Sequence, residues 1–307
     1  MKKFFIIILF LCLCCTSKTN SQDIFVAYTI DNNYPIFALL SINSILKNNN
    51  DNNQYFFYII ENNLSDKNKQ KMSDYVNNRN QKIEFIHFDT DVIDNGKILY
   101  KHINRVTNIG LARIMLPELL PDNIQKVIYL DGDTLVTDNL SILYNIDLKN
   151  RAAGMVLNIT PPEGLLKNKQ RYYNSGVIVF NLDKWRKNKI SNRMLDFIND
   201  NFELFYTKNK EKAYLYPDQD LLNIILKNDI YTIATEWNNQ TTPSGTLLAD
   251  SKGIYHYVGQ NKPWDFPITN QEYYKTYYKY WNKSSLKKYK YYYFLKSIKH
   301  KLLSIFK

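Results

Sequence analysis

The chain has 307 residues, of which 45% are hydrophobic, and a formal net charge of +11 at pH 7. This length and composition indicate a folded globular protein with one core, or one core and a small appended subdomain. The charge lies at the two ends: residues 1–22 carry three lysines and residues 273–307 carry ten, with no acid in either segment, whereas the body between them has 27 basic and 29 acidic residues. A near-neutral body excludes nucleic acid as the partner of the fold.

The first 22 residues are predicted to be a leader outside the fold. Phe4–Cys15 is an apolar run of 12 residues that follows a basic start and precedes a polar stretch. A helix needs ~20 apolar residues to span a bilayer, so the pattern is typical of a secretory signal or a short anchor. The run also holds every cysteine of the chain, which excludes disulfides and thiolate metal sites from the body: Cys12, Cys14 and Cys15.

The first half of the body alternates short apolar runs, rich in β-branched and aromatic residues, with longer segments of helical period. This alternation predicts βαβ units and a mainly parallel sheet. The predicted strands are Ile24–Tyr28, Tyr55–Ile60, Ile83–Phe88 and Lys126–Leu130, and the predicted helices are Pro35–Lys47, Ser65–Asn78 and Leu111–Leu120.

Beyond Asp133 the expected strands lie closer together. They are Ala152–Leu157, Gly176–Asn181, Ile230–Ala234 and Gly253–Val258, with helices at Asp183–Phe202 and Asp218–Lys227. No internal repeat and no Gly/Pro-rich linker divides the body. The sequence therefore predicts a single α/β domain over residues 23–272.

The sharpest local motif is the apolar strand that ends in Asp131, Gly132 and Asp133. Ligands of open α/β sheets bind at the carboxyl ends of strands. Two carboxylates there, separated by a glycine that allows close approach, suit a divalent cation on a diphosphate. An ordinary strand-to-turn junction also uses Asp and Gly, so other motifs have to decide between the two.

A second motif is HYVGQNKPW, residues 256–264. The imidazole of His256 is a competent third ligand for Mn²⁺. Gly259 allows backbone amides to approach a phosphate, and Lys262 is placed to neutralise phosphate charge. A single histidine in an apolar strand is more often a structural hydrogen-bonding residue, but its spacing from Gly259 and Lys262 favours the functional interpretation.

Two further stretches are polar next to predicted core elements. Asn174 and Ser175 lead into a strand in YYNSGVIVFN, and Asp218 and Gln219 open a helix in YPDQDLLN. Amides and acids of this kind hydrogen-bond sugar hydroxyls, but a turn and a helix start explain them equally well.

The segment AYTIDNNYP follows the first predicted strand and contains Asp31, Asn33 and Tyr34. An aromatic face at this position could stack on a base while the polar side chains read its edge. Turn chemistry accounts for the same residues.

Six motifs in one order resemble glycosyltransferase family 8, which holds bacterial lipopolysaccharide galactosyl- and glucosyltransferases and, more distantly, glycogenin. They are TIDNNYP, GLARIMLPELLP, YLDGDTLV, YYNSGVIVFN, YPDQDLLN and HYVGQNKPW, between Asp23 and about Trp264. The resemblance implies a GT-A fold, which is a Rossmann-like mixed sheet flanked by helices. It also implies a UDP-sugar donor, Mn²⁺ with Mg²⁺ as the alternative, and retention of anomeric configuration.

The resemblance further implies a role for individual residues. The metal ligands would be Asp131, Asp133 and His256, and the uridine would be held by Asp31, Asn33 and Tyr34. Gly259 and Lys262 would meet the diphosphate. The donor sugar would be surrounded by Arg113, Asn174, Ser175, Asp218 and Gln219, with Asp218 and Gln219 as the catalytic candidates.

The implied activity is transfer of a hexose, glucose or galactose, from UDP-glucose or UDP-galactose to a glycan or lipopolysaccharide-type acceptor. UDP is a good leaving group, so no activated protein nucleophile is required, and the metal and Lys262 would stabilise charge on the diphosphate. We favour direct front-face attack over a transient adduct on Gln219 or Asp218. The alternative function is a non-catalytic nucleotide-binding module tethered to a membrane by its basic tail.

Residues 273–307 interleave ten lysines with nine tyrosines and are predicted to form a membrane-associating tail. Each basic residue close to an anionic surface contributes ~1 kcal/mol, and aromatic residues suit the headgroup layer. A solvated helical face is the alternative. The tail favours the cytoplasmic face of a membrane, whereas the leader favours an exported or lumenal location.

Overall fold

A computed structural model describes residues 21–90, 108–160, 162–168, 171–207, 209, 212–241, 252–259, 262–265 and 271–305. Residues 1–20 of the predicted leader lie outside this range. Within it, no helix is both long and apolar enough to cross a membrane.

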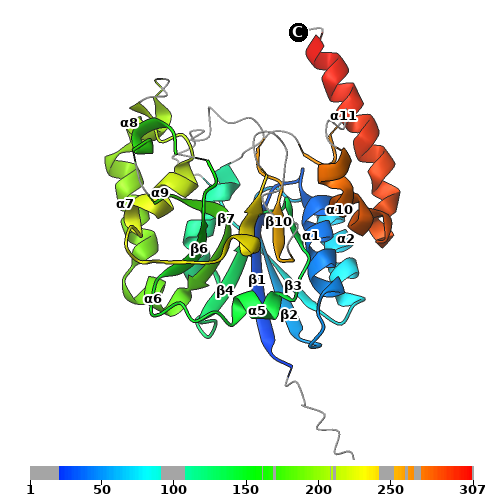
Figure 1. Ribbon diagram of the computed structural model, residues 1–307, viewed down its shortest axis with the longest axis horizontal. Coiled ribbons are helices and arrows are strands. Elements are labelled where there is room, and N and C mark those ends of the chain that lie inside the picture. The colour runs from blue at the N-terminus through cyan, green and yellow to red at the C-terminus, as the bar shows by residue number, and fades with distance from the viewer. Residues whose placement is uncertain are drawn as a thin grey trace, which may run out of the picture.

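The described residues form a central seven-stranded sheet in the order β3-β2-β1-β4-β7-β6-β8 (Figure 1). Its strands are β1 (Asp23–Ile30), β2 (Gln54–Glu61), β3 (Lys82–His87), β4 (Lys126–Leu130), β6 (Ala153–Leu157), β7 (Tyr173–Asn181) and β8 (Ile230–Thr232). Strand β7 runs antiparallel to both of its neighbours, and the other pairings are parallel. The predicted mixed, mainly parallel α/β sheet is confirmed.

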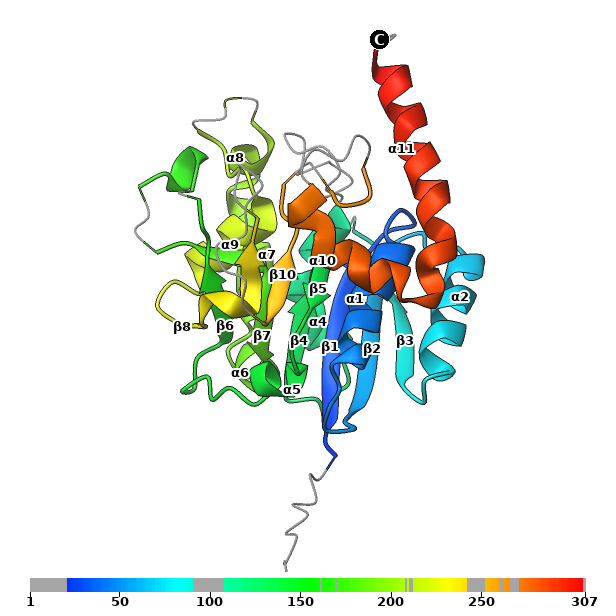
Figure 2. The ribbon, with the colours of Figure 1, turned by 45° about the vertical axis from the view of Figure 1, so that its right-hand side comes forward.

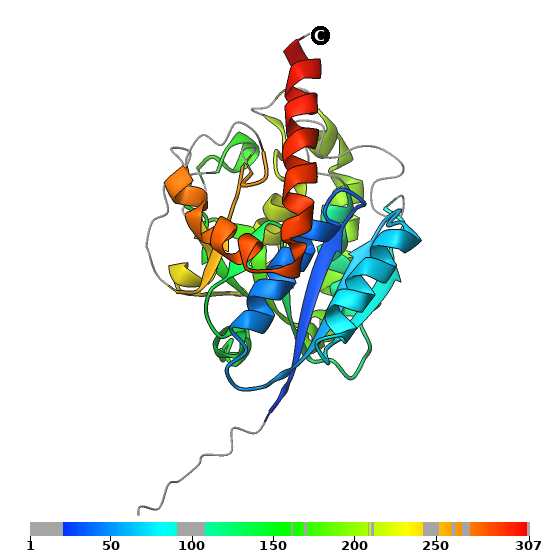
Figure 3. The same cartoon turned by 90° about the vertical axis from the view of Figure 1, so that its right-hand side faces the viewer.

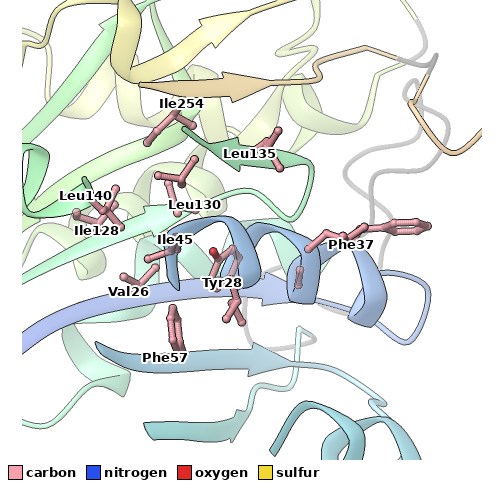
Figure 4. Packing of buried hydrophobic residues seen from close by; sticks show 14 of the residues in the cluster. Val26, Tyr28, Phe37, Ile45, Phe57, Ile128, Leu130, Leu135, Leu140 and Ile254 are labelled. Atoms are coloured by element: carbon pink, nitrogen blue, oxygen red, sulfur yellow. The ribbon is translucent and has the colours of Figure 1, made fainter. Parts of the chain in front are cut away.

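Apolar side chains cover both faces of this sheet, as expected for strands buried on both sides. One face packs against α1 (Pro35–Lys47), α2 (Asp66–Asn77), α5 (Leu140–Tyr144) and α10 (Gln271–Asn282). The other packs against η1 (Asn108–Met115), α4 (Leu116–Leu119), α6 (Leu182–Lys187), α7 (Ile190–Asp200), α8 (Phe202–Tyr206) and α9 (Pro217–Ile225). Figure 2 shows α1 and α10 in front of the sheet, and Figure 4 shows Tyr28 and Ile45 between β1 and α1.

A small second sheet, in the order β5-β10-β9, lies over the first face. It consists of β5 (Thr134–Val136), β10 (Ile254–His256) and β9 (Asn239–Gln240), the last preceded by η4 (Thr235–Asn238). Strand β10 runs antiparallel to β5 and pairs His256 with Thr134. This pairing brings the histidine of one motif beside the aspartates of another.

Two predicted helices differ from the structure. The predicted helix Leu111–Leu120 is the 3₁₀ helix η1 followed by the single turn α4, because Pro117 has no amide to donate into a continuous helix. The predicted helix Asp183–Phe202 is divided into α6 and α7 at Lys189, whose φ of 48° is left-handed. Strand β7 also begins at Tyr173, earlier than predicted, so Asn174 and Ser175 are strand residues.

The C-terminal segment has two parts. Helix α10 and the 3₁₀ helix η5 (Ser285–Tyr289) bury Tyr277, Trp281 and Leu286 in the core, at 1%, 1% and 3% exposure. The following helix, α11 (Lys290–Ile305), extends beyond the body on the side to which the carboxyl end of β1 points (Figure 1 and Figure 3). In packing, residues up to about Tyr293 therefore belong to the body, because the Tyr293 ring packs on Phe37 of α1 with ring centroids 4.7 Å apart. The rest of α11 projects from the body.

Candidate active site

The predicted motifs meet at the carboxyl edge of the central sheet. Asp31 follows β1 and Asp131 follows β4, two parallel neighbours. Because β7 is antiparallel to β4, its first residues lie at the same edge, and the amide of Asp131 donates to the carbonyl of Gly176 at 2.8 Å. The topology therefore collects side chains from three strands at one place.

The ligand atoms of Asp131, Asp133 and His256 all lie within 4.8 Å of one another. His256 Nε2 is 3.6 Å from Asp131 Oδ2 and 3.3 Å from Asp133 Oδ1. His256 is buried at the end of β10, whereas the side chain of Asp131 is 26% exposed. The cluster is thus covered by protein at His256 and accessible to solvent at Asp131.

Lys262 is buried beside this cluster, and its Nζ donates to Asp133 Oδ2 at 2.5 Å and to the carbonyl of Tyr257 at 2.7 Å. Burial alone would raise the pKa of the Asp133 carboxyl. The ammonium group of Lys262 outweighs that effect and holds this pKa well below its usual value. Asp133 is therefore a carboxylate, the form that binds a cation.

The donor set fits a divalent metal. Asp133 Oδ1 is buried and accepts no hydrogen bond from any described residue, although it faces His256 Nε2. A buried carboxylate oxygen is costly in that state, and a cation between it and the imidazole would satisfy both. Two carboxylates and one imidazole suit Mn²⁺ or Mg²⁺ with positions left for substrate oxygens.

Arg113 joins the metal-side carboxylate to the residues predicted around the sugar. Its guanidinium lies 3.0 Å from Asp131 Oδ1 and 2.9 Å from Asp218 Oδ2, and it donates to the carbonyl of Ser175 at 2.8 Å. Arg113 and Asp218 are each 6% exposed. This buried arginine fixes the spacing between Asp131 and Asp218.

The start of α9 is anchored to β7 by side chains. Ser175 Oγ donates to Asp218 Oδ2 at 2.7 Å, and the amide of Ser175 donates to Gln219 Oε1 at 3.0 Å. The N-cap of α9 is Tyr216, which makes no side-chain cap hydrogen bond, and Asp218 is the second residue of the helix. Asp220 is buried and accepts from the hydroxyl of Tyr172, and its burial raises its pKa to about 6.

The residues predicted to hold the uridine lie at the rim of the same edge. Asp31 Oδ1 accepts from the amide of Asn33 at 2.8 Å, which is the turn chemistry that the sequence also allowed. Tyr34 is half-buried, edge-on to Trp264 with ring centroids 6.0 Å apart. A Cβ on Gly132 would lie 3.1 Å from Tyr34, so this ring is next to the aspartate motif.

The remaining predicted phosphate contact is Gly259, in the loop after β10. Its φ of +82° is a conformation that favours glycine, and apart from its chain neighbours no described residue has an atom within 4 Å of the place a Cβ would take. The structure thus leaves open space at this position.

Comparisons with known proteins agree with this geometry. The sequence profile described as "Glycosyl transferase family 8" matches residues 25–267. The chain belongs to glycosyltransferase family 8. Among curated relatives it is 28% identical to general stress protein A of Bacillus subtilis, over 76% of this chain and 85% of that protein. It is also 28% identical to a lipopolysaccharide 1,2-glucosyltransferase of Escherichia coli, over 80% and 74%.

The fold agrees with solved structures of glycosyltransferases. The galactosyltransferase LgtC, solved in complex with donor and acceptor sugar analogs, superposes with a TM-score of 0.69 at 19% identity, covering 87% of this chain and 99% of that chain. The WbbM bifunctional glycosyltransferase superposes with a TM-score of 0.68 at 19% identity, covering 89% and 52%. The family 8 chain therefore has the expected GT-A fold.

Sequence reasoning missed three residues that shape this family 8 site. The hydroxyl of Tyr129 donates to Asp131 Oδ1 at 2.6 Å, Asn238 contacts His256, and Gly176 lies against His256. The run Asn238–Gln240 is a signal that could have been used, because consecutive amides are unusual in a buried strand. Gly176 has no such sequence signal, since a single glycine in a strand has many explanations.

We expect Gly176→Ala to remove metal binding. An added Cβ would lie 2.0 Å from His256 Cε1 and 2.8 Å from Asp131 Oδ2, so the two ligands would have to move apart. A Mn²⁺ titration followed by electron paramagnetic resonance measures the loss. Gly154→Ala is the matched control, since its Cβ would meet apolar atoms of Ile233 and Leu148 at 2.7 Å in the core. It should lower Tm and keep Mn²⁺ affinity; equal Mn²⁺ binding by Gly176→Ala would contradict the assignment.

The described residues also form an open pocket of about 460 Å³ away from this site. It lies between the carboxyl-terminal end of α1, the loops that precede β2 and β3, and the start of η5, and is lined by Asn43, Lys47, Arg79 and Lys283 among others. None of the predicted site residues lines it. The site assignment rests on the converging side chains at the sheet edge and not on cavity size.

Proposed function

We propose that this family 8 enzyme moves a hexose, glucose or galactose, from a UDP-sugar to a hydroxyl of a glycan or lipopolysaccharide-type acceptor, with Mn²⁺ and with retention of anomeric configuration. The observation that carries the proposal is the cluster of Asp131, Asp133 and His256 at the carboxyl edge of the sheet. The similarity to the Escherichia coli 1,2-glucosyltransferase supports a glucosyl donor and a lipopolysaccharide acceptor. The similarity in fold to the galactosyltransferase LgtC is equally compatible with a galactosyl donor.

In this proposal the bond between the sugar C1 and the diphosphate oxygen breaks, and a bond from C1 to the acceptor oxygen forms on the same face. The acceptor proton leaves with the departing phosphate oxygen, so no protein nucleophile is needed. A bound divalent ion would supply charge neutralisation for the UDP that leaves. Asp131, Asp133 and His256 would hold that ion.

The chain's own residues would bind and orient the donor. Asp31, Asn33 and Tyr34 would contact the uridine at the rim, and Gly259 would allow a phosphate to approach the backbone. Lys262 is held in place by Asp133, so its charge would lie next to the metal and the diphosphate. The donor sugar would lie among residues fixed to one another by hydrogen bonds and ion pairs: Arg113, Asn174, Ser175, Asp218 and Gln219.

Asp218 and Gln219 are the proposed catalytic residues, since they lie in the first turn of α9 and contact Ser175 at the same edge of the sheet. Gln219 Oε1 already accepts from the amide of Ser175, and Asp218 is paired with Arg113. Both groups are therefore pre-positioned, as stabilisation of a developing positive charge on the sugar requires. This anchoring favours direct front-face attack over an adduct on either side chain.

A non-catalytic nucleotide-binding module is the other candidate from sequence. Such a module needs neither a set of three side chains that could bind a metal nor a buried arginine that bridges Asp131 and Asp218. The retention of both, together with family membership, favours the enzyme.

The test is a screen of UDP-sugars for metal-dependent UDP release, with and without lipopolysaccharide fragments as acceptors. We expect release from UDP-glucose or UDP-galactose that needs Mn²⁺ and increases with an acceptor. Release from neither sugar, or full release in EDTA, would contradict the proposal.

We also propose that the C-terminal end contacts an anionic membrane, through α11 and not through the whole of residues 273–307. Tyr291, Tyr292 and Leu295 of α11 are 69%, 59% and 46% exposed, and residues 290–307 include five lysines. The helix projects beyond the carboxyl edge at which the site lies (Figure 3). A membrane there would present a lipid-linked acceptor to the site.

Deletion of residues 290–307 should therefore abolish salt-sensitive binding to anionic vesicles, since each lysine contributes ~1 kcal/mol near the surface. The deletion leaves α10 and η5, whose Tyr277, Trp281 and Leu286 complete the core, and removes the contact of Tyr293 with Phe37, so Tm should fall by a small amount only. Flotation with anionic and with zwitterionic vesicles measures the effect. If the shortened protein still floats with anionic vesicles, α11 is not the anchor.

A further inference from the structure

A chain of amide side chains extends from His256 through the buried Asn238 and Asn174 to the half-buried Asn158. His256 Nδ1 lies 2.9 Å from Asn238 Oδ1, and Asn238 Nδ2 donates to Asn174 Oδ1 at 2.9 Å. Asn174 Nδ2 in turn donates to Asn158 Oδ1 at 3.0 Å. Asn238 is 0% exposed and no motif assigned it a role. It ends η4, directly before β9, which pairs with the strand of His256.

The direction of this chain is fixed by a backbone group. The amide of Gly176 donates to the same Asn174 Oδ1, at 2.9 Å. A backbone N–H is always a donor, so the Asn174 atom that receives it is the carbonyl oxygen. Asn238 must therefore present its NH₂ group to Asn174 and its carbonyl oxygen to His256.

The consequence for His256 follows from the chemistry of imidazole. A neutral imidazole has one N–H and one nitrogen with a free lone pair. Because Asn238 presents an acceptor, Nδ1 carries the hydrogen. Nε2 then has the lone pair and faces Asp131 Oδ2 and Asp133 Oδ1 at 3.6 and 3.3 Å.

We propose that Asn238 is a positioning residue that holds His256 as the Nδ1–H tautomer, so that Nε2 is ready to bind a divalent cation with Asp131 and Asp133. Asn174 and the amide of Gly176 transmit the orientation, and the same Asn174 borders the proposed sugar site. Partners of this kind raise the basicity of a ligating histidine and fix its ring. This inference rests on the proposed metal site.

The test compares Asn238→Leu with Asn238→Asp. Leucine has a similar volume and no acceptor, so we expect Mn²⁺ affinity to fall about 10- to 100-fold, the usual loss for such a partner. Aspartate restores an acceptor for Nδ1 and should bind Mn²⁺ more tightly than the leucine variant. Mn²⁺ titrations followed by electron paramagnetic resonance give the constants. Asn43→Leu is the control, because Asn43 is a buried amide on α1 that accepts from Tyr75 and is not part of the chain of amides. The Mn²⁺ affinity of this variant should be that of the wild type.

A second measurement needs no metal to bind and no variant of Asn238. Nitrogen-15 NMR of the histidines in the metal-free protein, at a pH where the ring is neutral, distinguishes the two tautomers, and His256→Gln identifies the signal. We expect Nδ1–H. An Nε2–H tautomer, or equal Mn²⁺ affinity in wild type and a folded Asn238→Leu, would overturn the inference. Failure of the wild type to bind Mn²⁺ while the Nδ1–H tautomer is present would instead count against the proposed function.

Discussion

Asp131→Asn should reduce sugar transfer by about 10³-fold or more, because Asp131 is a proposed metal ligand and its loss would remove several kcal/mol of charge stabilisation in the transition state. The fold should survive. Asparagine keeps an oxygen that can accept from Tyr129 and Arg113, which now contact Asp131 Oδ1, and the side chain is 26% exposed. Turnover under saturating UDP-sugar, Mn²⁺ affinity and Tm measure the three effects.

Asp133→Asn, at the same site, should change stability as well as activity. Asp133 is paired with the buried Lys262, so the substitution leaves an unpaired charge in the core and lowers stability as well as activity. Comparing the two variants separates the effect of the metal from the effect of the ion pair. Full activity of Asp131→Asn would rule out Asp131 as a metal ligand.

Arg113→Ala should destabilise the protein by about 3 to 5 kcal/mol and lower Tm by roughly 10 °C, because it removes the partner of buried carboxylates. Asp218 and Asp131 both lose their ion pair, and the carbonyl of Ser175 loses a donor. Transfer should fall as well, since the spacing between the metal side and the sugar side is no longer fixed. Thermal unfolding with and without UDP and Mn²⁺ measures the first effect, and turnover the second.

Arg113→Lys is the matched control. One ammonium group keeps the charge but cannot reach both carboxylates in the way a planar guanidinium does. An intermediate Tm and intermediate activity are therefore expected. If Arg113→Ala unfolds at the temperature of the wild type, the ion pairs with Asp131 and Asp218 contribute no stability and the bridge is not needed.

The first half of the fold was predictable because its signals are local. The strand before Asp131 matches β4 residue for residue, and Pro35–Lys47 matches α1, since apolar period and a proline at the helix start act over a few residues. The break at Lys189 was not predictable, because the apolar spacing continues across it and a left-handed lysine has no sequence signature. Strand β5 was also missed, as three residues give too short a pattern.

The sequence motifs predicted which residues the candidate site brings together, but they did not predict the contacts between those residues. The motifs named the three metal-ligand candidates, but the pairing of His256 with Thr134 joins segments more than a hundred residues apart, and nothing local encodes that register. For the same reason the contact of Lys262 with Asp133, and the place of Asn238 behind His256, required the fold. Long-range pairing of short strands is where sequence pattern carries the least information.

The most direct measurement is the anomalous scattering of Mn²⁺ in crystals grown with UDP and manganese. We expect one strong peak bonded to Asp131, Asp133 and His256 Nε2, with diphosphate oxygens completing the coordination beside Lys262. A peak elsewhere on the protein, or diphosphate bound at this edge with no manganese between it and the two aspartates, would contradict the proposed metal site.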